Sequence, residues 1–237
     1  MDEIDLVAAR AGSTRGSELH WGGGTPNTLS PEEFVRLFHH IGFWFDLDQN
    51  LAHSIEIDPR WLSPGLAATH ADCGVTRASL GVQTLAPHVQ EAIGRVQPYD
   101  MIVSAVDCLR SAGIQQINFD LMYGLPQQST DDLLNTIRLA TALRPSRIAL
   151  FGYAHVPWFK RRQRVIREAA LPGAEARYDQ AEAARTALLA IGYVAIGIDH
   201  YALSDDPLAR AADDGALRRN FHGYVEQVPH AIIGFGP

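Results

Sequence analysis

Three consecutive glycines give the strongest chemical signal in the sequence. Gly22-Gly23-Gly24 precedes Thr25 and Pro26. A glycine run lets the backbone approach a ligand closely and expose its N–H groups to a carboxylate or a phosphate. A tight turn between a strand and a helix would account for the same residues, and the spacing is not that of the dinucleotide-binding fingerprint. The run alone therefore leaves both interpretations open.

Polar residues also accompany other apolar runs of the chain. Glu56-Ile57-Asp58-Pro59 closes one run, where a carboxylate can accept from a ligand's amino group or ribose, or can pair with Arg60. Asp120 lies inside the apolar run Ile117–Met122. Because an unpaired buried carboxylate is costly, Asp120 must have a partner, either a ligand or a neighbouring cation. A lone histidine such as His200 is more often structural than catalytic.

Short apolar runs predict the strands that would position these residues. Several are apolar at both alternate positions, which is typical of strands buried on two faces. The predicted strands are Glu18–Trp21, Ser54–Ile57, Arg77–Val82, Ile117–Met122, Arg147–Phe151 and Tyr193–Ile198.

Amphipathic segments between the strands predict helices. Ser30-Pro31-Glu32-Glu33 combines an N-cap, a first-turn proline and a capping-box glutamate, and Gly42 can end the helix that follows. Similar patterns predict helices over Ile102–Leu109, after the cap candidates Ser129 and Thr130, and over Ala174–Ile191.

The alternation of strands and helices indicates an α/β fold with right-handed crossovers and a parallel sheet. A barrel and an open doubly wound sheet both satisfy the pattern. In either fold, ligands bind where loops meet at the carboxyl ends of the strands. Because polar residues follow nearly every predicted strand, we expect a single convergent site.

Composition narrows the class of protein. The chain has 237 residues, of which 46% are hydrophobic and 20% charged, as in a globular protein of one domain or slightly more. No run approaches the length of a transmembrane helix, and the acidic start Met1–Asp5 is unlike a signal peptide. We therefore expect a cytoplasmic protein. Its net charge of −7 argues against a nucleic-acid partner.

Both ends of the chain suggest a truncated domain. Residues 1–16 are predicted as a leading helix and loop with no strand before them. Residues 193–237 are predicted as the final strand and the start of a further segment, which stops within the apolar stretch Ala231–Pro237. Natural domains seldom finish on an unpaired buried run. We expect one domain over residues 1–237, cut at both ends.

A series of motifs extends the glycine signal over almost the whole chain. The first is Leu19-His20-Trp21-Gly22-Gly23-Gly24-Thr25-Pro26. The others are Ile55–Arg60, Leu80–Gln83, Asn118–Pro126, Gly152–His155, Gly197–Tyr201 and Arg219–Tyr224. In order and spacing, this set resembles the oxygen-independent coproporphyrinogen III oxidases of the radical S-adenosylmethionine (SAM) superfamily.

The resemblance implies a fold and a reaction. The fold would be a partial parallel (β/α) TIM-like barrel of the radical SAM type, missing its first strand. The reaction would be the oxidative decarboxylation of coproporphyrinogen III to protoporphyrinogen IX in anaerobic haem biosynthesis. In the family, a four-iron four-sulfur (4Fe-4S) cluster receives an electron from a donor and cleaves SAM to a 5′-deoxyadenosyl radical. This radical abstracts a propionate hydrogen.

The resemblance also implies two bound SAM molecules. Gly23 and Glu56 would contact the first. The second would contact Gly24, Thr25, Gln83, Arg95, Asp120 and Ala154. The residues by themselves point to the triglycine amides and to Asp120, whereas Arg95 would be read as a solvated helix arginine. No catalytic residue is identified.

The cysteines depart from the family pattern. The family holds its cluster with a Cys-x3-Cys-x2-Cys loop upstream of the triglycine, and the sequence has only Cys73 and Cys108. Both are typical of small buried residues, so no metal ligand is predicted. Because reductive cleavage of SAM needs the cluster, we expect the chain to be inactive alone. We expect the family's C-terminal helical domain to be missing as well.

Two non-catalytic functions are the alternatives. The haem-chaperone branch of the same superfamily shares the triglycine, Gly-Val-Gln and Asp-Leu-Met motifs. It lacks the Tyr-Ala-His, Asp-His and Arg-Asn-Phe-x-Gly-Tyr elements found here, which favours the oxidase. A degenerate subunit that binds SAM without chemistry is the second alternative. The basic run Lys160–Arg167 is usually a solvated face, although arginine side chains there would suit the carboxylates of a porphyrinogen.

Overall fold

A computed structural model describes residues 1–12, 14–220, 223–225 and 231–236 of the chain, without the side chain of Arg162. The chain divides into two compact units, which are described separately. The first comprises Met1–Ser79, Ala105–Gln116 and Pro229–Pro237, and the second comprises Leu80–Ser104 and Ile117–Val228. The expectation of one truncated domain over residues 1–237 remains a prediction.

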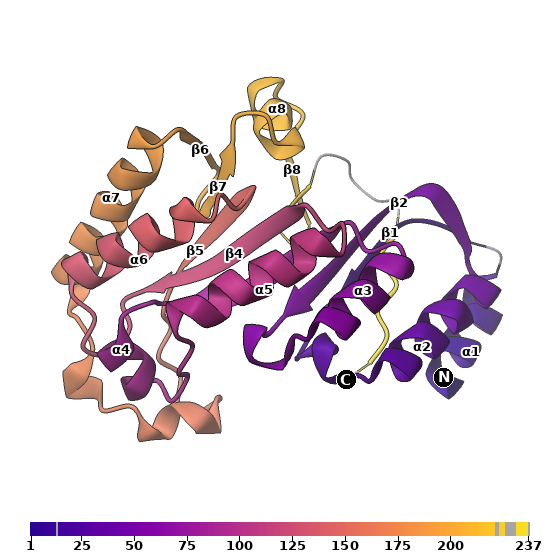
Figure 1. The fold of residues 1–237 in the computed structure, drawn as a ribbon, viewed down its shortest axis with the longest axis horizontal. Helices are drawn as coiled ribbons and strands as arrows, with labels where there is room; N and C mark the ends of the chain where they lie inside the picture. Colours follow the sequence, from indigo (N-terminus) through magenta and orange to yellow (C-terminus); the bar gives the residue numbers. More distant parts are fainter. Residues whose placement is uncertain (13, 221–222, 226–230, 237) are drawn as a thin grey trace. The chain divides into compact units, whose positions relative to one another are not determined.

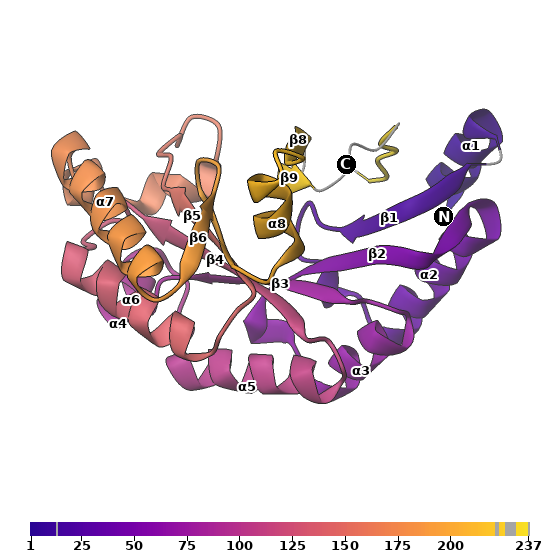
Figure 2. The ribbon, with the colours of Figure 1, turned by 90° about the horizontal axis from the view of Figure 1, so that it is seen from above.

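The first unit pairs two parallel strands and covers them with helices (Figures 1 and 2). Its elements are α1 (Asp2–Ala11), β1 (Arg15–Trp21), α2 (Pro31–Trp44), β2 (Asp46–Ile57) and α3 (Pro64–Asp72), with short 3₁₀ turns at Pro26–Thr28 and Pro59–Trp61. Both strands include the predicted residues but begin earlier. The register places His20 of β1 opposite Ser54 of β2.

Helix α2 begins as its sequence predicts. The Ser30 hydroxyl accepts from the N–H of Glu33 at 3.2 Å, and the Glu33 carboxylate accepts from the N–H of Ser30 at 2.8 Å, which completes a capping box. The prediction that Gly42 ends the helix is wrong, because α2 continues to Trp44. The N–H of Phe45 still bonds the carbonyl of Ile41 at 2.9 Å, and the last turn is held in place by burial of the Phe45 ring.

Aromatic rings and two histidines form much of the core of the first unit. Trp21 packs on Phe34 with ring centroids 4.5 Å apart, and Phe34 meets the edge of His70 at 4.6 Å. His53 and His70 are buried. Burial lowers the pKa of each histidine to about 4, so both rings are neutral in the folded protein near neutral pH.

The second unit continues the alternation of strands and helices. Strand β3 (Arg77–Gln83) and helix α5 (Tyr99–Ser111) have residues in both units, and the first residue of β4 (Gln116–Tyr123) belongs to the first unit. The remaining elements are α4 (Pro87–Ala92), α6 (Thr130–Ala142), β5 (Arg147–Gly152), α7 (Ala174–Ala190), β6 (Tyr193–Ile196), β7 (His200–Leu203), α8 (Pro207–Asp213), β8 (Arg218–Asn220) and β9 (Gly223–Val225), with 3₁₀ turns at Arg161–Val165 and Glu168–Ala170. Helices α6 and α7 pack on each other.

The predicted parallel order holds for β4 and β5 and fails after them. β4 and β5 are parallel, but β7 is antiparallel to both β5 and β6. The predicted strand Tyr193–Ile198 is present as β6 but ends at Ile196, because the chain turns at Gly197, whose φ of 68° favours glycine. His200 consequently lies in β7 rather than after the last strand.

A buried ion pair fastens β5 to the start of α8. The Arg147 Nε lies 2.9 Å from both carboxylate oxygens of Asp206, and its Nη2 lies 2.7 Å from Oδ1. Asp206 also caps α8 by accepting from the N–H of Leu208 at 2.8 Å. None of the helices in the described ranges is both long and apolar enough to cross a membrane.

Candidate functional site

The triglycine run directly follows β1 in the first unit. Gly23 has a φ of 79°, a conformation that glycine adopts without strain. Apart from chain neighbours, no heavy atom of the described residues lies within 4 Å of the place where a Cβ would stand on Gly23 or Gly24. Both residues are exposed. Their backbone is therefore accessible to a ligand from outside.

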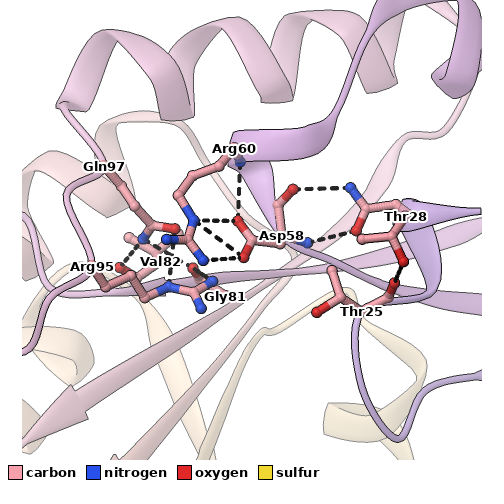
Figure 3. Close-up of polar contacts among 9 residues, drawn as sticks. Thr25, Thr28, Asp58, Arg60, Gly81, Val82, Arg95 and Gln97 are labelled. Atoms are coloured by element: carbon pink, nitrogen blue, oxygen red, sulfur yellow. Dashed lines mark hydrogen bonds and ion pairs between the residues drawn. The ribbon is translucent and has the colours of Figure 1, made fainter. Parts of the chain in front are cut away.

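Asn27 ties the loop after the glycines to the end of β2. Its Nδ2 donates to the carbonyl of Asp58 at 2.9 Å, and its Oδ1 accepts from the Asp58 N–H at 3.0 Å. The carbonyl of Thr25 accepts from the N–H of Thr28 at 3.0 Å and from its hydroxyl at 2.8 Å (Figure 3). These bonds fix the backbone that carries the predicted ligand residue Thr25.

Glu56 lies beside the first glycine of the run. A Cβ on Gly22 would stand 3.0 Å from the Glu56 Oε1 and 2.7 Å from the His20 Nε2. These two side-chain atoms lie 3.5 Å apart, and the His20 Nδ1 is 2.8 Å from the Ser54 hydroxyl. Gly22 therefore leaves the space in which His20 and Glu56 meet. The first unit thus brings Glu56 next to the glycine run.

A carboxylate of this segment does pair with Arg60 as predicted, but it is not that of Glu56. The Arg60 guanidinium instead binds Asp58, with Nη2 at 2.7 Å from Oδ2 and Nε at 3.0 Å from Oδ1 (Figure 3). The Asp58 side chain is buried and also accepts from the N–H of Arg60 at 3.1 Å. The Glu56 carboxylate is left half-exposed at the carboxyl end of β2, with His20 as its neighbour.

Gln83 and Arg95 come together over Gly81 in the second unit. A Cβ on Gly81 would stand 2.9 Å from the Gln83 Nε2 and 3.1 Å from the Arg95 Nη2. Arg95 donates to the Gly81 carbonyl at 3.2 Å and to the Gln97 Oε1 at 3.1 Å. Gln97 in turn donates to the carbonyls of Gly81 and Val82 (Figure 3).

The environment of Arg95 corrects an expectation. Arg95 is half-buried in the loop after α4 and holds the end of β3, so it is not a solvated helix arginine. Gln83, the last residue of β3, has a φ of 64°, which is unusual for a residue with a side chain and occurs mostly at functional sites and turns.

Asp120 lies in β4 and Ala154 lies two residues after the neighbouring strand β5. Asp120 lies between Phe119 and Leu121, whose side chains are both buried, and opposite Ala149 of β5. It is half-buried and has an interaction partner in the chain, as its position requires. Ala154 is exposed after β5, and its carbonyl accepts from the Gln163 side chain at 3.0 Å.

Other polar residues named from the sequence have mixed placements. Burial raises the pKa of the Tyr153 hydroxyl, which lies 3.1 Å from the His155 Nδ1. Burial also lowers the pKa of His200. Arg161 and Arg164 are exposed. Phe221 and His222 of the predicted motifs lie outside the described structure. The side chain of Arg162, in the basic run, lies outside it as well.

Sequence reasoning missed three residues of these clusters, namely His20, Gln97 and Arg177. His20 could have been found, because residues two apart on a strand share a face and Gly22 follows it at that spacing. No local pattern marks Gln97 or Arg177. The Arg177 side chain lies over Gly124 and Gly152, which are remote from it in sequence.

The two cysteines do not fit a 4Fe-4S cluster. Cys73 is buried, and burial raises the pKa of its thiol, while Cys108 is half-buried. Two thiols cannot supply the thiolates that such a cluster requires. Across the described ranges, no group of three or more His, Cys, Asp or Glu side chains is placed to hold a metal ion. No step of a reaction is therefore assigned to a cluster.

Comparison with known proteins supports the fold. The solved structure of coproporphyrinogen III oxidase from Escherichia coli, a radical SAM enzyme, matches with a TM-score of 0.92 and 36% identity over 95% of this chain and 52% of that chain. An archaeal Elp3 from Methanocaldococcus infernus matches at 16% identity with a TM-score of 0.56, covering 77% of this chain and 48% of that chain. The chain therefore has the α/β fold of the radical SAM type.

Curated relatives point to the same family. An oxygen-independent coproporphyrinogen III oxidase from Bradyrhizobium diazoefficiens is 46% identical over 99% of this chain and 52% of its own length. Its namesake from Synechocystis is 41% identical over 99% of this chain and 50% of its own length. The chain thus spans about half the length of these relatives. Residues 1–140 match the model of the radical SAM superfamily, and the chain belongs to this superfamily.

Proposed function

We propose that this chain is the SAM-binding part of an oxygen-independent coproporphyrinogen III oxidase. The whole protein would convert coproporphyrinogen III to protoporphyrinogen IX by a radical SAM mechanism in anaerobic haem biosynthesis. Coproporphyrinogen III is the proposed substrate, an electron donor the proposed partner, and the cytoplasm the proposed location. The observation that carries this proposal is the accessible triglycine backbone with the Glu56 carboxylate beside it.

The chemistry of the first cluster suits the amino-acid end of SAM. Exposed N–H groups of Gly23 and its neighbours can donate to the SAM carboxylate. The Glu56 carboxylate can accept from the SAM ammonium group, and a charge-assisted hydrogen bond of this kind is stronger than a neutral one. We therefore assign Gly23 and Glu56 to a first SAM molecule.

A second SAM molecule is assigned to the remaining predicted residues. Arg95 brings a cation to the carboxyl end of β3, and Gln83 offers an amide beside it. Asp120 offers a carboxylate to ribose hydroxyls or to the ammonium group. The full set is Gly24, Thr25, Gln83, Arg95, Asp120 and Ala154.

Calorimetric titration of the 237-residue chain with SAM tests the proposal. We expect SAM to bind and the substitution Glu56→Gln to weaken binding by roughly 10-fold or more, the worth of a hydrogen bond to a charged group. The control is Glu18→Gln, an exposed carboxylate on β1, which should leave the affinity unchanged. Absence of SAM binding by the wild-type chain would refute the proposal.

A haem titration separates the oxidase from the haem-chaperone alternative. A haem chaperone would bind haem stoichiometrically and shift its Soret absorption, whereas the oxidase assignment predicts no such complex. The motifs Gly152–His155 and Gly197–Tyr201 favour the oxidase. Tight haem binding by a chain that also binds SAM would move the assignment to the chaperone branch.

A further inference from the structure

The guanidinium of Arg177 covers two glycines at the carboxyl ends of β4 and β5. Gly124 directly follows β4, and a Cβ there would stand 3.0 Å from the Arg177 Nε and 3.4 Å from its Cζ. Gly152 is the last residue of β5, and a Cβ there would stand 3.2 Å from the Arg177 Nη2. The two glycines therefore leave the space that the guanidinium occupies.

This guanidinium has no anionic partner in the part of the chain that the structure describes. Its N–H groups make no hydrogen bond or ion pair there, although the side chain is half-buried. Other arginines of the chain are paired, among them Arg60 with Asp58 and Arg147 with Asp206. A guanidinium carries five N–H donors, so Arg177 keeps a full set of donors at the ends of two parallel strands.

The position of Arg177 in its helix adds to the positive potential. It lies in the first turn of α7, and its backbone N–H bonds the carbonyl of Gly173 at 3.0 Å. The first turn of a helix stabilises anions and disfavours cations. A lone cation there is unfavourable in the empty protein and becomes favourable when an anion binds beside it.

The hydroxyl of Tyr123 completes the arrangement. A Cβ on Gly152 would stand 2.9 Å from this hydroxyl and 3.2 Å from the Arg177 Nη2. A phenol can donate one hydrogen bond, and a guanidinium fork can donate two parallel ones. A planar carboxylate matches this set of donors, and the carboxyl ends of parallel strands are where ligands bind in such folds.

We propose that Arg177, with the Tyr123 hydroxyl, binds a carboxylate group of a ligand. This inference rests on the proposed function, whose two ligands both carry carboxylates: the methionine carboxylate of SAM and the propionates of the tetrapyrrole. Gly124 and Gly152 are required because any side chain on them would displace the guanidinium. Arg177 is thus a ligand-binding residue that none of the motifs contains.

Binding measurements with matched ligands distinguish the two sources of the carboxylate. The 237-residue chain is titrated with SAM and with decarboxylated SAM, and separately with coproporphyrin III and with its tetramethyl ester. Arg177→Gln should lower the affinity for one carboxylate-bearing ligand by roughly 10- to 100-fold. The affinity for the carboxylate-free analogue of that ligand should be unchanged. Arg177→Lys should give an intermediate loss, because it keeps the charge without the fork.

Two further variants control for folding. Arg185→Gln removes an exposed arginine from the same helix and should leave all affinities unchanged. Gly152→Ala should reproduce the loss with Arg177 still present, because the heavy atoms nearest to its Cβ are the ends of the flexible Tyr123 and Arg177 side chains.

The outcomes separate this inference from the proposed function. Wild-type affinity for both carboxylate ligands in Arg177→Gln would overturn the role of Arg177 alone. An equal loss for a ligand and its carboxylate-free analogue would overturn it too. A wild-type chain that binds neither SAM nor coproporphyrin III would overturn the proposed function.

Discussion

The indole nitrogen of Trp21 donates a 2.7 Å hydrogen bond to Nε2 of His53. Because Nε2 accepts this bond, the proton of the neutral imidazole is on Nδ1, which is buried without a hydrogen-bond partner in the described structure. Trp21 immediately precedes Gly22, so the bond ties the residue before the glycine run to β2. The neutral state of His53 is therefore part of what holds this end of β1.

Acidification should destabilise the first unit through His53 and His70. Burial lowers the pKa of both from 6.5 to about 4, so the unfolded chain binds more protons between these values. Stability is full above about pH 6.5 and falls as the pH drops toward 4, by on the order of 3 kcal/mol per histidine. Urea unfolding from pH 8 to pH 4 measures this slope.

Two variants identify the source of that slope. His70→Phe removes one buried titrating group and should flatten the pH dependence, whereas the exposed His39→Gln should not. Carboxylates with a lowered pKa, such as Asp132, lose their contribution only below about pH 4, outside the window. A stability that is constant from pH 7 to pH 4.5 would contradict the prediction.

Breaking the buried pair between Arg147 and Asp206 should cost far more than breaking an exposed one. Asp206→Asn removes the negative charge that Arg147 binds. The side chains of Arg147 and Asp206 are only 15% and 3% exposed, so the substitution should lower the free energy of unfolding by about 3–5 kcal/mol. The matched change Asp48→Asn, in the exposed pair with Arg15, should cost less than about 1 kcal/mol. Equal losses in chemical denaturation would count against this difference.

Gly22→Ala should weaken SAM binding with little effect on folding. The new Cβ would stand 2.7 Å from the His20 Nε2 and 3.0 Å from the Glu56 Oε1, so these flexible side-chain ends must move away. We expect at least a roughly 10-fold loss of SAM affinity if Glu56 binds SAM. Gly65→Ala, which meets no heavy atom within 4 Å, is the control. Unchanged affinity in Gly22→Ala would show that the placement of Glu56 does not matter for binding.

Asp120→Asn should distinguish a ligand contact from a structural ion pair. The substitution keeps the shape and removes the charge. A ligand contact predicts a nearly unchanged melting temperature and a loss of about 1.5–3 kcal/mol in SAM binding. A structural pair would instead cost about 3–5 kcal/mol of stability. We expect the first result, from calorimetry beside thermal melting, and a collapsed melting temperature with unaltered affinity would reject it.

Reconstitution with iron and sulfide should load no 4Fe-4S cluster onto this chain. Cys73 and Cys108 provide two thiols, fewer than such a cluster requires. With SAM and a reductant, the chain should accordingly release no 5′-deoxyadenosine. Stoichiometric iron and sulfide, with charge-transfer absorption that disappears in Cys73→Ser or Cys108→Ser, would refute this expectation.

The sequence by itself determined the elements whose signals are local. Ser30 forms the capping box that its sequence predicts, and Ser129, one of two cap candidates, caps α6, because a cap depends only on residues three apart. The predicted strands around Trp21, Glu56 and Asp120 are present. Only alternate residues of β4 and of the end of β2 are fully buried, so the expected burial on two faces is not found in these strands. The glycine run was also recognisable from local sequence, because its conformational freedom belongs to the glycines themselves.

Only the tertiary structure decided which side chains meet. Strand register pairs β1 with β2 and so gives Glu56 the neighbour His20, while Asp58 is the carboxylate that pairs with Arg60. The turn at Gly197 reverses the last predicted strand into a hairpin. Arg177 reaches Gly124 and Gly152 across a long separation in sequence. Such contacts depend on how strands and helices pack, and no local pattern of residue types encodes that packing.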